Sequence, residues 1–263
     1  MIYLREISIR KANSRIFPFN LDIVKNIKGL NFDSPVTFFV GENGSGKSTI
    51  IEALAAFMKL PIIGGESIGS DPSLRHAREL ADFIRPSWEI RTHRGFFLRA
   101  EDFFRFTRKL QETVRELDDD IAHYEENYSG YGLQLARGSA EGQKKSIIRK
   151  YGDDLNANSH GESFLKLFQE RFVPKGIYLL DEPEVPLSPL RQIGLLSMIK
   201  EMVDGHDSQF IIATHSPILM AYPGANIYNF DTIPPELTAY EDLEHVNVMR
   251  NFLDAPERYL RYL

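Results

Sequence analysis

The 263-residue sequence predicts an α/β fold, a mainly parallel sheet flanked by helices with an inserted helical lobe. Three apolar runs predict it: Val36–Val40 leads into a glycine-rich stretch, while Ile177–Leu180 and Gln209–Ala213 end in polar or charged residues. Such runs are typical of parallel strands buried on both faces, and open α/β sheets bind ligands at the carboxyl ends of their strands. The sequence therefore predicts a site at that edge of the sheet.

The first 70 residues contain the elements expected before the lobe. Alternating apolar and polar residues predict an edge strand over residues 1–10, and Asn20–Val24 is a weaker strand candidate. The helix that follows the glycine-rich stretch ends before Pro61, because proline cannot continue a helix. Residues 62–69 then form a glycine-containing connection.

Charged sequence with helical periodicity runs from residue 75 to about residue 148. Residues 128–132 are typical of a loop or lid tip, and no heptad repeat is long enough to predict a coiled-coil arm. We expect a helical lobe over about residues 71–163, inserted into a single domain whose core comprises residues 1–70 and 164–263. Five apolar side chains are spaced for one buried helix face: Phe103, Phe106, Leu110, Val114 and Leu117.

Strand and helix patterns alternate again after the lobe. A helix is predicted over roughly Pro189–Val203, between the second and third apolar runs. A final strand is predicted over Asn226–Phe230, followed by an acidic helical tail. This alternation favours a predominantly parallel sheet.

The stretch from Gly41 to Thr49 fits the pattern G-x-x-x-x-G-K-[ST]. A glycine-rich turn lets successive backbone N–H groups converge on one anion, and the dipole of the following helix adds positive potential. Lys47 then reaches the β- and γ-phosphates, and the Ser48 hydroxyl completes a Mg²⁺ shell. The predicted phosphate-binding residues are Gly41, Glu42, Asn43, Gly44, Ser45, Gly46, Lys47, Ser48 and Thr49.

Two acids end the apolar run Ile177–Leu180. Asp181, at the end of a strand beside the phosphate loop, is placed to hold the Mg²⁺ water shell together with Ser48. Glu182 points one residue further, toward an attacking water, and is the predicted base or water-positioning residue. The alternative, a buried strand that ends in an acidic turn before Pro183, is common for this pattern alone.

A histidine follows the Gln209–Ala213 run, within Thr214-His215-Ser216-Pro217. An imidazole at the same edge of the sheet hydrogen-bonds a γ-phosphate and senses whether it is present. A lone histidine at a strand end is more often structural, but its order and spacing after the acidic pair favour a functional role. His215 is therefore predicted to be catalytic, together with Lys47 and Glu182.

The composition is that of an ordinary globular protein, with 43% hydrophobic and 26% charged residues. No apolar run is long enough to cross a bilayer and the N-terminus lacks the layout of a signal peptide, so we expect a cytoplasmic protein without direct membrane insertion. The absence of cysteine excludes disulfides, thiolate metal ligands and cysteine nucleophiles.

A formal net charge of −6 argues against a protein that coats nucleic acid by charge alone. A local basic face stays open, because arginine and lysine crowd residues 75–115 and 144–150, whereas residues 116–126 are acidic. The alternative is a set of solvated helix faces with intrahelical ion pairs, which the sequence alone favours.

With these three motifs the chain resembles an ATP-binding-cassette (ABC) ATPase, of the AAA-family group related to SMC-like DNA-repair ATPases. The resemblance covers essentially the whole chain. It implies a P-loop NTPase fold of the ABC type, ATP and Mg²⁺ as ligands, and hydrolysis of ATP to ADP and phosphate.

The resemblance also implies a signature motif, normally L-S-G-G-Q, at a helix start before the acidic strand. Residues 158–163 stand there, with Ser159 and Gly161 in the matching places and His160 and Glu162 as departures. A serine hydroxyl and N–H groups at a helix N-terminus bind anions, so they would hold the γ-phosphate of ATP on a second subunit. The implied assembly is a homodimer closed around ATP; without the flanking motifs the stretch would be only a helix cap.

Three further family positions are less regular in this chain. Residues 94–102 lack the glutamine that transport subunits use, and Glu101 is the nearest polar substitute. The aromatic ring that stacks on adenine is Phe17 or Phe19, unless both rings are simply core. Ser188, in a stretch that replaces the usual interface loop, is a candidate contact to the partner subunit.

These features favour an ATPase that dimerises around ATP and acts with DNA or a protein partner, in DNA repair or phage defence. The alternative is the ATP-binding subunit of a membrane ABC transporter, against which the missing glutamine and the altered signature weigh. A third reading is a nucleotide-gated binding module with little turnover; Glu182 and His215 favour hydrolysis instead.

Overall fold

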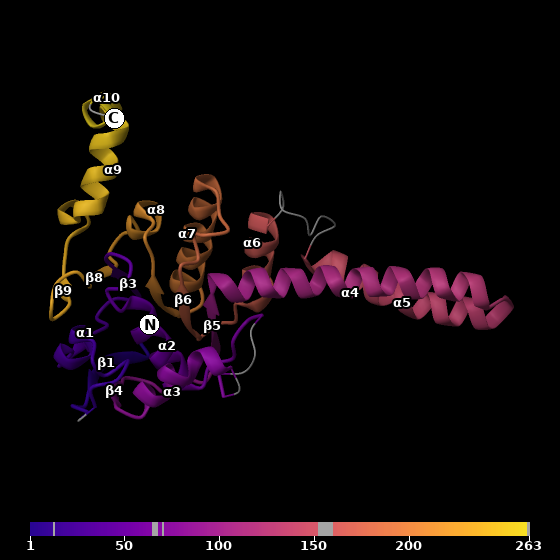
Figure 1. Ribbon diagram of the computed structural model, residues 1–263, viewed down its shortest axis with the longest axis horizontal. Coiled ribbons are helices and arrows are strands. Elements are labelled where there is room, and N and C mark those ends of the chain that lie inside the picture. The colour runs from indigo at the N-terminus through magenta and orange to yellow at the C-terminus, as the bar shows by residue number, and fades with distance from the viewer. Residues whose placement is uncertain (13, 65–67, 70, 152–159, 262–263) are drawn as a thin grey trace.

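The computed structural model describes residues 1–12, 14–64, 68–69, 71–151 and 160–261. Figure 1 shows an α/β body from which a pair of helices projects to one side and two short helices project near the C-terminus. Among the helices in these ranges, none combines the length and apolar character that crossing a membrane requires.

A six-stranded sheet forms the centre of the body, in the order β5-β6-β7-β3-β8-β9. Its first five strands pair in parallel, and only β9 is antiparallel, as predicted for a mainly parallel sheet. The predicted strands at the three apolar runs are confirmed. The strand bounds are β3 Val36–Val40, β5 Gly95–Arg99, β6 Ile177–Asp181, β7 Gln209–Ala213, β8 Asn226–Asn229 and β9 Glu236–Leu237.

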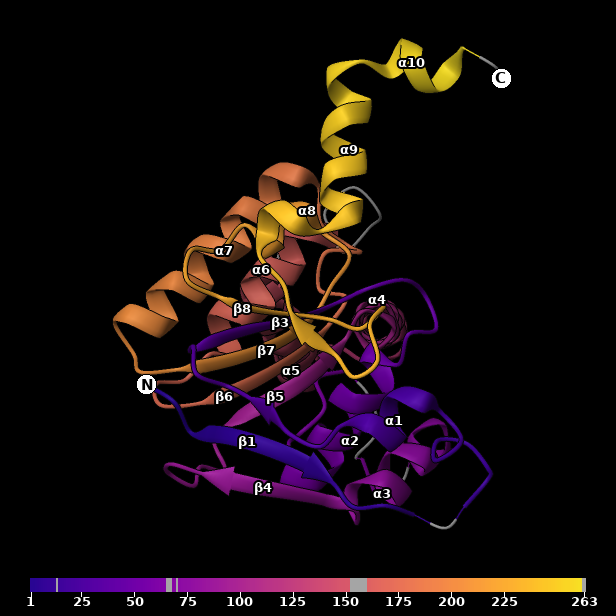
Figure 2. The ribbon, with the colours of Figure 1, turned by 90° about the vertical axis from the view of Figure 1, so that its left-hand side faces the viewer.

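Helices cover both faces of this sheet (Figure 2). Alternate side chains of β3 show the two cores, because Phe39 packs on the side of α2 (Lys47–Met58) and Phe38 packs on the side of α7 (Pro189–Asp204). Burial on both faces is why these strands are continuously apolar. The helices predicted after the phosphate loop and after the acidic pair are thereby confirmed. Shorter helical elements complete the core: η1 Pro72–Leu74, α3 Arg75–Ala81, α6 His160–Arg171 and α8 Pro217–Met220.

A second, three-stranded antiparallel sheet lies over the α2 side, in the order β2-β1-β4. The Gln209 side chain fixes it to the main sheet, since its amide oxygen accepts hydrogen bonds from the N–H groups of Tyr3 and Leu4 at 2.8 and 2.9 Å. The predicted N-terminal strand is confirmed, although it belongs to this smaller sheet. The bounds are β1 Leu4–Ile9, β2 Leu30–Asn31 and β4 Ile84–Trp88.

The strand suggested for Asn20–Val24 is wrong, because Asp22–Asn26 forms a short helix, α1. Ile23 and Val24 bury one face of this turn, and Lys25 pairs with Asp22 at 2.8 Å on the other. A run of apolar residues this short fits either period, so packing against the core decides between them.

Two helices form a projecting arm (Figure 1). The sequence did not predict this arm, because it contains no long heptad repeat. The helices α4 (Ala100–Asn127) and α5 (Gly130–Tyr151) run antiparallel and turn where a loop tip was predicted. Ion pairs join them, from Arg137 to Glu125 at 3.0 Å and from Lys144 to Asp118, around few buried side chains. A hairpin of this length needs only scattered contacts, not a sustained heptad seam.

The range expected to be a helical lobe, residues 71–163, therefore also contains strands of both sheets. The strand β4 belongs to the small sheet, and β5 is the edge of the main sheet beside β6. The continuous helical part begins at Ala100. The predicted acidic tail is helical, with η3 Tyr240–Asp242, α9 Glu244–Asp254 and α10 Pro256–Leu260.

Candidate functional site

The predicted phosphate loop connects β3 to α2, and its backbone takes a positive φ at each of its three glycines, Gly41, Gly44 and Gly46. Gly41 has φ 141° and Gly46 has φ 99°, in the region where side chains are strained. A Cβ on Gly41 would lie 2.8 Å from Oδ1 of Asp231, and one on Gly46 would lie 2.6 Å from Cγ2 of Ile23. The loop thus packs tightly on both sides of its curl.

Lys47 is the first residue of α2 and its side chain is only 4% exposed. Its Nζ atom donates hydrogen bonds to the carbonyl oxygens of Gly41 at 2.7 Å and Glu42 at 2.9 Å. Burial lowers the pKa of Lys47, and the carboxylates of Glu182 and Asp231 oppose that shift. A phosphate is a stronger, charge-assisted acceptor than a backbone carbonyl, so this ammonium group fits a nucleotide.

The two predicted metal ligands, Ser48 in the first turn of α2 and Asp181 at the end of β6, lie next to each other. The Ser48 hydroxyl donates a hydrogen bond to Oδ1 of Asp181 at 3.2 Å. Among the described residues, no group of three or more histidine, aspartate or glutamate side chains is arranged to hold a metal ion. One hydroxyl and one carboxylate suit Mg²⁺, which takes its remaining ligands from water and nucleotide phosphates. When bound, Mg²⁺ would neutralise charge on those phosphates.

Asp181 is buried among other carboxylates. Burial, followed by the charges of Glu52, Glu182 and Glu184, raises its pKa from the usual 3.8 to about 8, while the Ser48 hydrogen bond opposes the rise. A cation beside Asp181 would relieve both the burial cost and the repulsion. The acidic surroundings therefore fit the predicted Mg²⁺ site.

Mg²⁺ should stabilise the nucleotide-free protein more strongly at about pH 8.5 than at about pH 6.5, because Mg²⁺ binding must displace the Asp181 proton. The folded state holds this proton more tightly than the unfolded chain does, so the carboxyl lowers stability as pH rises from 3.8 to about 8. Asp181→Asn should abolish the pH dependence and weaken the Mg²⁺ effect. Thermal unfolding with and without Mg²⁺ at both pH values measures this, and an undiminished Mg²⁺ shift in the variant would remove Asp181 from the site.

Glu182 and His215 lie side by side at the ends of β6 and β7. Glu182 adopts φ 52°, an unusual conformation for a residue with a side chain, and its N–H donates to the Ala213 carbonyl at 2.9 Å. Its Oε1 lies 3.8 Å from Nε2 of His215. That nitrogen is shielded from water and has no hydrogen-bond partner in the described part of the chain. A strained acid and an unpaired imidazole nitrogen together are typical of a reaction site.

Burial lowers the pKa of His215, and the nearby Lys47 ammonium lowers it further. The imidazole is therefore neutral near pH 7, with one ring nitrogen able to donate a hydrogen bond. The sequence did not single out Glu184, whose Oε1 accepts the His215 backbone N–H at 2.6 Å. Glu184 thus fixes the turn that carries the histidine.

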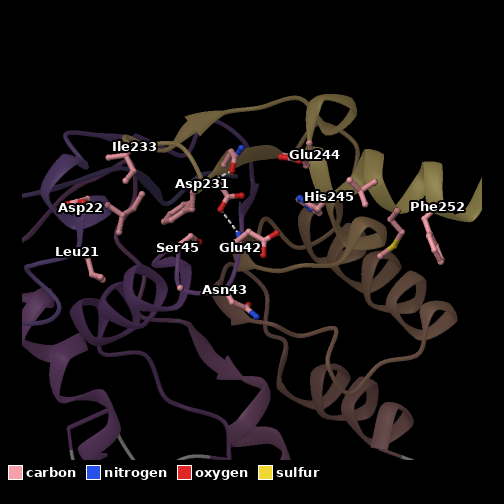
Figure 3. Close-up of a pocket in the computed structure, with 17 residues that line it drawn as sticks. Leu21, Asp22, Glu42, Asn43, Ser45, Asp231, Ile233, Glu244, His245 and Phe252 are labelled. Atoms are coloured by element: carbon pink, nitrogen blue, oxygen red, sulfur yellow. Dashed lines mark hydrogen bonds between the residues drawn. The ribbon is translucent and has the colours of Figure 1, made fainter. Parts of the chain in front are cut away.

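Two cavities flank the phosphate loop. A smaller one of about 180 Å³ includes Lys47, Ser48, Thr49 and Glu182, and it thus contains two of the three predicted catalytic residues, Lys47 and Glu182. A larger cavity of about 1010 Å³ lies against the other side of the loop, between Glu42–Ser45 and α9 (Figure 3).

Asp231, in the larger cavity, was not predicted from the sequence. It accepts the Glu42 N–H at 2.7 Å, and Figure 3 shows this bond at the entrance to the loop.

Burial and contacts distinguish the residues proposed for the less regular family positions. Phe17 is half-exposed and lines the smaller cavity, whereas Phe19 is buried in the core against Phe83. Glu101 forms an ion pair with Arg99 at 2.9 Å and lines neither cavity, so it does not take the place of the family's glutamine in this conformation. Ser188 is exposed immediately before α7.

The predicted signature, residues 158–163, lies partly outside the described residues. Ser159 lies outside the described residues. Gly161 belongs to α6, whose described part begins at His160. The roles of both residues stay predictions.

Two family models match the chain. One is described as "AAA domain" and matches residues 9–59; the other is described as "AAA domain, putative AbiEii toxin, Type IV TA system" and matches residues 66–221, more than half of the chain. The chain belongs to this AAA-domain family. Membership confirms the predicted resemblance to P-loop ATPases of the ABC type and the predicted fold class, and it supports nucleotide binding.

Curated relatives agree with this assignment. Translation initiation factor RLI1 of Saccharomyces cerevisiae is 24% identical over 245 residues, which are 92% of this AAA-domain chain and 34% of that protein. The thiamine import ATP-binding protein ThiQ of Chelativorans sp. is 28% identical over 186 residues, 70% of this chain and 68% of that protein. The chain thus spans about a third of the length of RLI1.

Solved structures include similar chains. The Smc head domain with an extended coiled coil from Pyrococcus furiosus has 14% identity and a TM-score of 0.46, and the match covers 97% of this AAA-domain chain and 100% of that chain. A nucleotide-free ATP-binding cassette from an ABC transporter has 16% identity and a TM-score of 0.49, with 100% and 99% covered.

Proposed function

We propose that this protein is a cytoplasmic ATPase that hydrolyses Mg²⁺-ATP and dimerises around it. The observation that carries the proposal is the convergence of five side chains at the carboxyl ends of neighbouring strands. Lys47, Ser48 and Glu182 line one small cavity, Asp181 contacts Ser48, and His215 lies beside Glu182. These groups come from three segments that are far apart in the sequence. A structural acidic turn or a chance glycine-rich loop does not require them to meet.

The chemistry assigned to each group follows from its position. The loop N–H groups and Lys47 bind the β- and γ-phosphates, and Ser48 and Asp181 hold the metal ion. Glu182 orients the attacking water and takes its proton, while the neutral His215 donates a hydrogen bond to the γ-phosphate. Phe17 lies at the mouth of the cavity and is the proposed contact for adenine.

The proposed dimer closes the site. The cavity around Lys47 is open and small, at about 180 Å³, so it encloses only part of a nucleotide. Ser159 and the Gly161 N–H of a second copy would complete the γ-phosphate contacts, and Ser188 would lie in the same seam. The proposal thus places each nucleotide between the loop of one subunit and the signature of the other.

Phosphate release by the purified protein tests the activity. Turnover that requires Mg²⁺ and saturates with ATP is expected. Absence of release above a no-enzyme blank, with ATP bound, would support the nucleotide-gated module instead. Copurification of a membrane permease from the native host would support the transporter alternative.

We also propose that the arm binds the phosphate backbone of DNA, because charge is segregated along it. The half nearest the body, residues 103–115 and 142–151, carries eight basic residues and a single acid, whereas residues 116–141 carry seven acids and a single base. Ion pairing within one helix does not require such segregation. Most of these basic side chains are exposed, among them Arg108, Lys109, Arg115, Arg149 and Lys150.

DNA binding should weaken steeply as salt increases, because each neutralised phosphate releases counterions. Replacing both Arg149 and Lys150 with alanine should reduce the slope of log affinity against log salt by about two. Arg137→Ala, in the acidic half, is the matched control and should leave the slope unchanged. Fluorescence anisotropy with a labelled duplex and ATP measures both. No binding at low salt would show that the basic half is only a solvated surface.

A further inference from the structure

Arg99 is a buried cation that neither the sequence nor the proposed reaction accounts for. It is the last residue of β5 and is 4% exposed. Its guanidinium donates to Asp102 at 2.6 and 2.9 Å and to Asp71 at 3.0 Å, and it lies 3.5 Å from a carboxylate oxygen of Glu52. Buried charges persist only when they are paired, and here one arginine serves four carboxylates on three separate segments, the fourth being Glu101 at 2.9 Å.

The position of this cluster relates it directly to the metal ligands. Arg99 pairs in register with Asp181 on the neighbouring strand β6. Glu52 follows Ser48 by four residues on α2, which places both side chains on the same helix face. Two contacts therefore join α2 to the sheet one turn apart, Ser48 to Asp181 at 3.2 Å and Glu52 to Arg99 at 3.5 Å.

We propose that Arg99 is a positioning residue for the metal site, which fixes Glu52 and α2 so that Ser48 and Asp181 stay aligned for Mg²⁺. This inference rests on the proposed ATPase function. Without the second contact, Glu52 loses its buried cation one helical turn from Ser48, and the hydroxyl and carboxylate are held less firmly in their common direction. Mutation of a residue that orients a metal ligand typically costs roughly 10- to 100-fold in metal affinity or activity.

The same cluster attaches the arm to the site. Asp102 is fully buried in the first turn of α4, where it holds two nitrogen atoms of Arg99. The path from the arm to the metal ligands thus consists of consecutive side-chain contacts, Asp102 to Arg99, Arg99 to Glu52, and one helical turn to Ser48. A planar guanidinium serves these separate carboxylates at once, which a lysine ammonium on one flexible stem does not do.

Arg99→Lys is the test, because lysine retains the buried positive charge but lacks the planar guanidinium that contacts several carboxylates at once. We expect the Mg²⁺ concentrations for half-maximal thermal stabilisation of the nucleotide-free protein and for half-maximal ATP turnover both to rise by about tenfold. The KM for ATP at saturating Mg²⁺ should change little. Arg105→Lys is a matched control, since Arg105 is 53% exposed and approaches the same Asp102 and Asp71 at 3.6 and 4.0 Å, and in the described part of the chain it forms no ion pair with Glu52. Its Mg²⁺ dependence, measured without DNA, should match the wild type.

Glu52→Gln tests the same contact from its other partner. It also replaces Arg99→Lys as the test if circular dichroism shows that Arg99→Lys does not fold. It should raise the Mg²⁺ requirement in the same direction, and the double variant should be no worse than the more affected single variant, because both remove one contact. Additive effects, an unchanged Mg²⁺ requirement in folded Arg99→Lys, or an equal shift in Arg105→Lys would each overturn the role of Arg99. A wild-type protein without Mg²⁺-dependent turnover would instead contradict the proposed function.

Discussion

Glu182→Gln should stop ATP turnover while ATP still binds. Glutamine keeps the size of the side chain and its hydrogen bonding, but it has no charge to draw a proton from water. The loss of a general base costs at least about 100-fold in rate. Phosphate release and binding of a fluorescent ATP analogue, measured on the same preparation, separate the two steps. Turnover within a few-fold of wild type would mean that another group activates the water.

The same variant should form a lasting dimer with ATP and none with ADP. The γ-phosphate would be held by Lys47 and His215 on one side and by Ser159 and the Gly161 N–H of the partner on the other, and these contacts disappear when phosphate leaves. Size-exclusion chromatography with light scattering, in ATP or ADP, measures the assembly.

Adding Ser159→Arg to Glu182→Gln places a bulky side chain in the proposed seam. The double variant should be monomeric while ATP still binds. A Glu182→Gln protein that stays monomeric in saturating ATP, or a double variant that still dimerises, would leave residues 158–163 as a helix cap only.

Lys47→Ala should abolish ATP binding or turnover. Lys47 is the loop's only lysine or arginine, and its Nζ lies at the loop carbonyls of Gly41 and Glu42, where phosphate oxygens would approach. Lys25→Ala, which removes an exposed lysine paired with Asp22, is the matched control for loss of one positive charge. Circular dichroism checks that both variants fold. Wild-type turnover in Lys47→Ala would contradict the phosphate-loop assignment.

The residues of the site that sequence could identify are those in short, contiguous patterns. Lys47 and Ser48 follow a glycine-rich turn, and Asp181 and Glu182 end a buried strand, so local sequence specifies both their type and their place. The parallel topology then brings the strand ends to one edge, which is why His215 also meets them.

The residues that sequence could not identify act through contacts between distant segments. Asp231 caps the loop from 189 residues away, and Arg99 meets Glu52 across 47 residues. Nothing in the residues around either one marks such a contact. The two phenylalanines of Phe17-Pro18-Phe19 show the same limit, since both are plausible ring contacts in sequence and only packing sends one to the core.

The arm has a mechanical consequence because it is long and its root is buried. With 28 residues, α4 extends about 42 Å from its first turn. A displacement of about 1 Å across that 5.4 Å turn tilts the helix by about 10° and carries the far end by about 7 Å. A displacement of about 1 Å at the Arg99 cluster, where α4 begins, would therefore move the far end of the arm by more than the 5.4 Å rise of one helical turn.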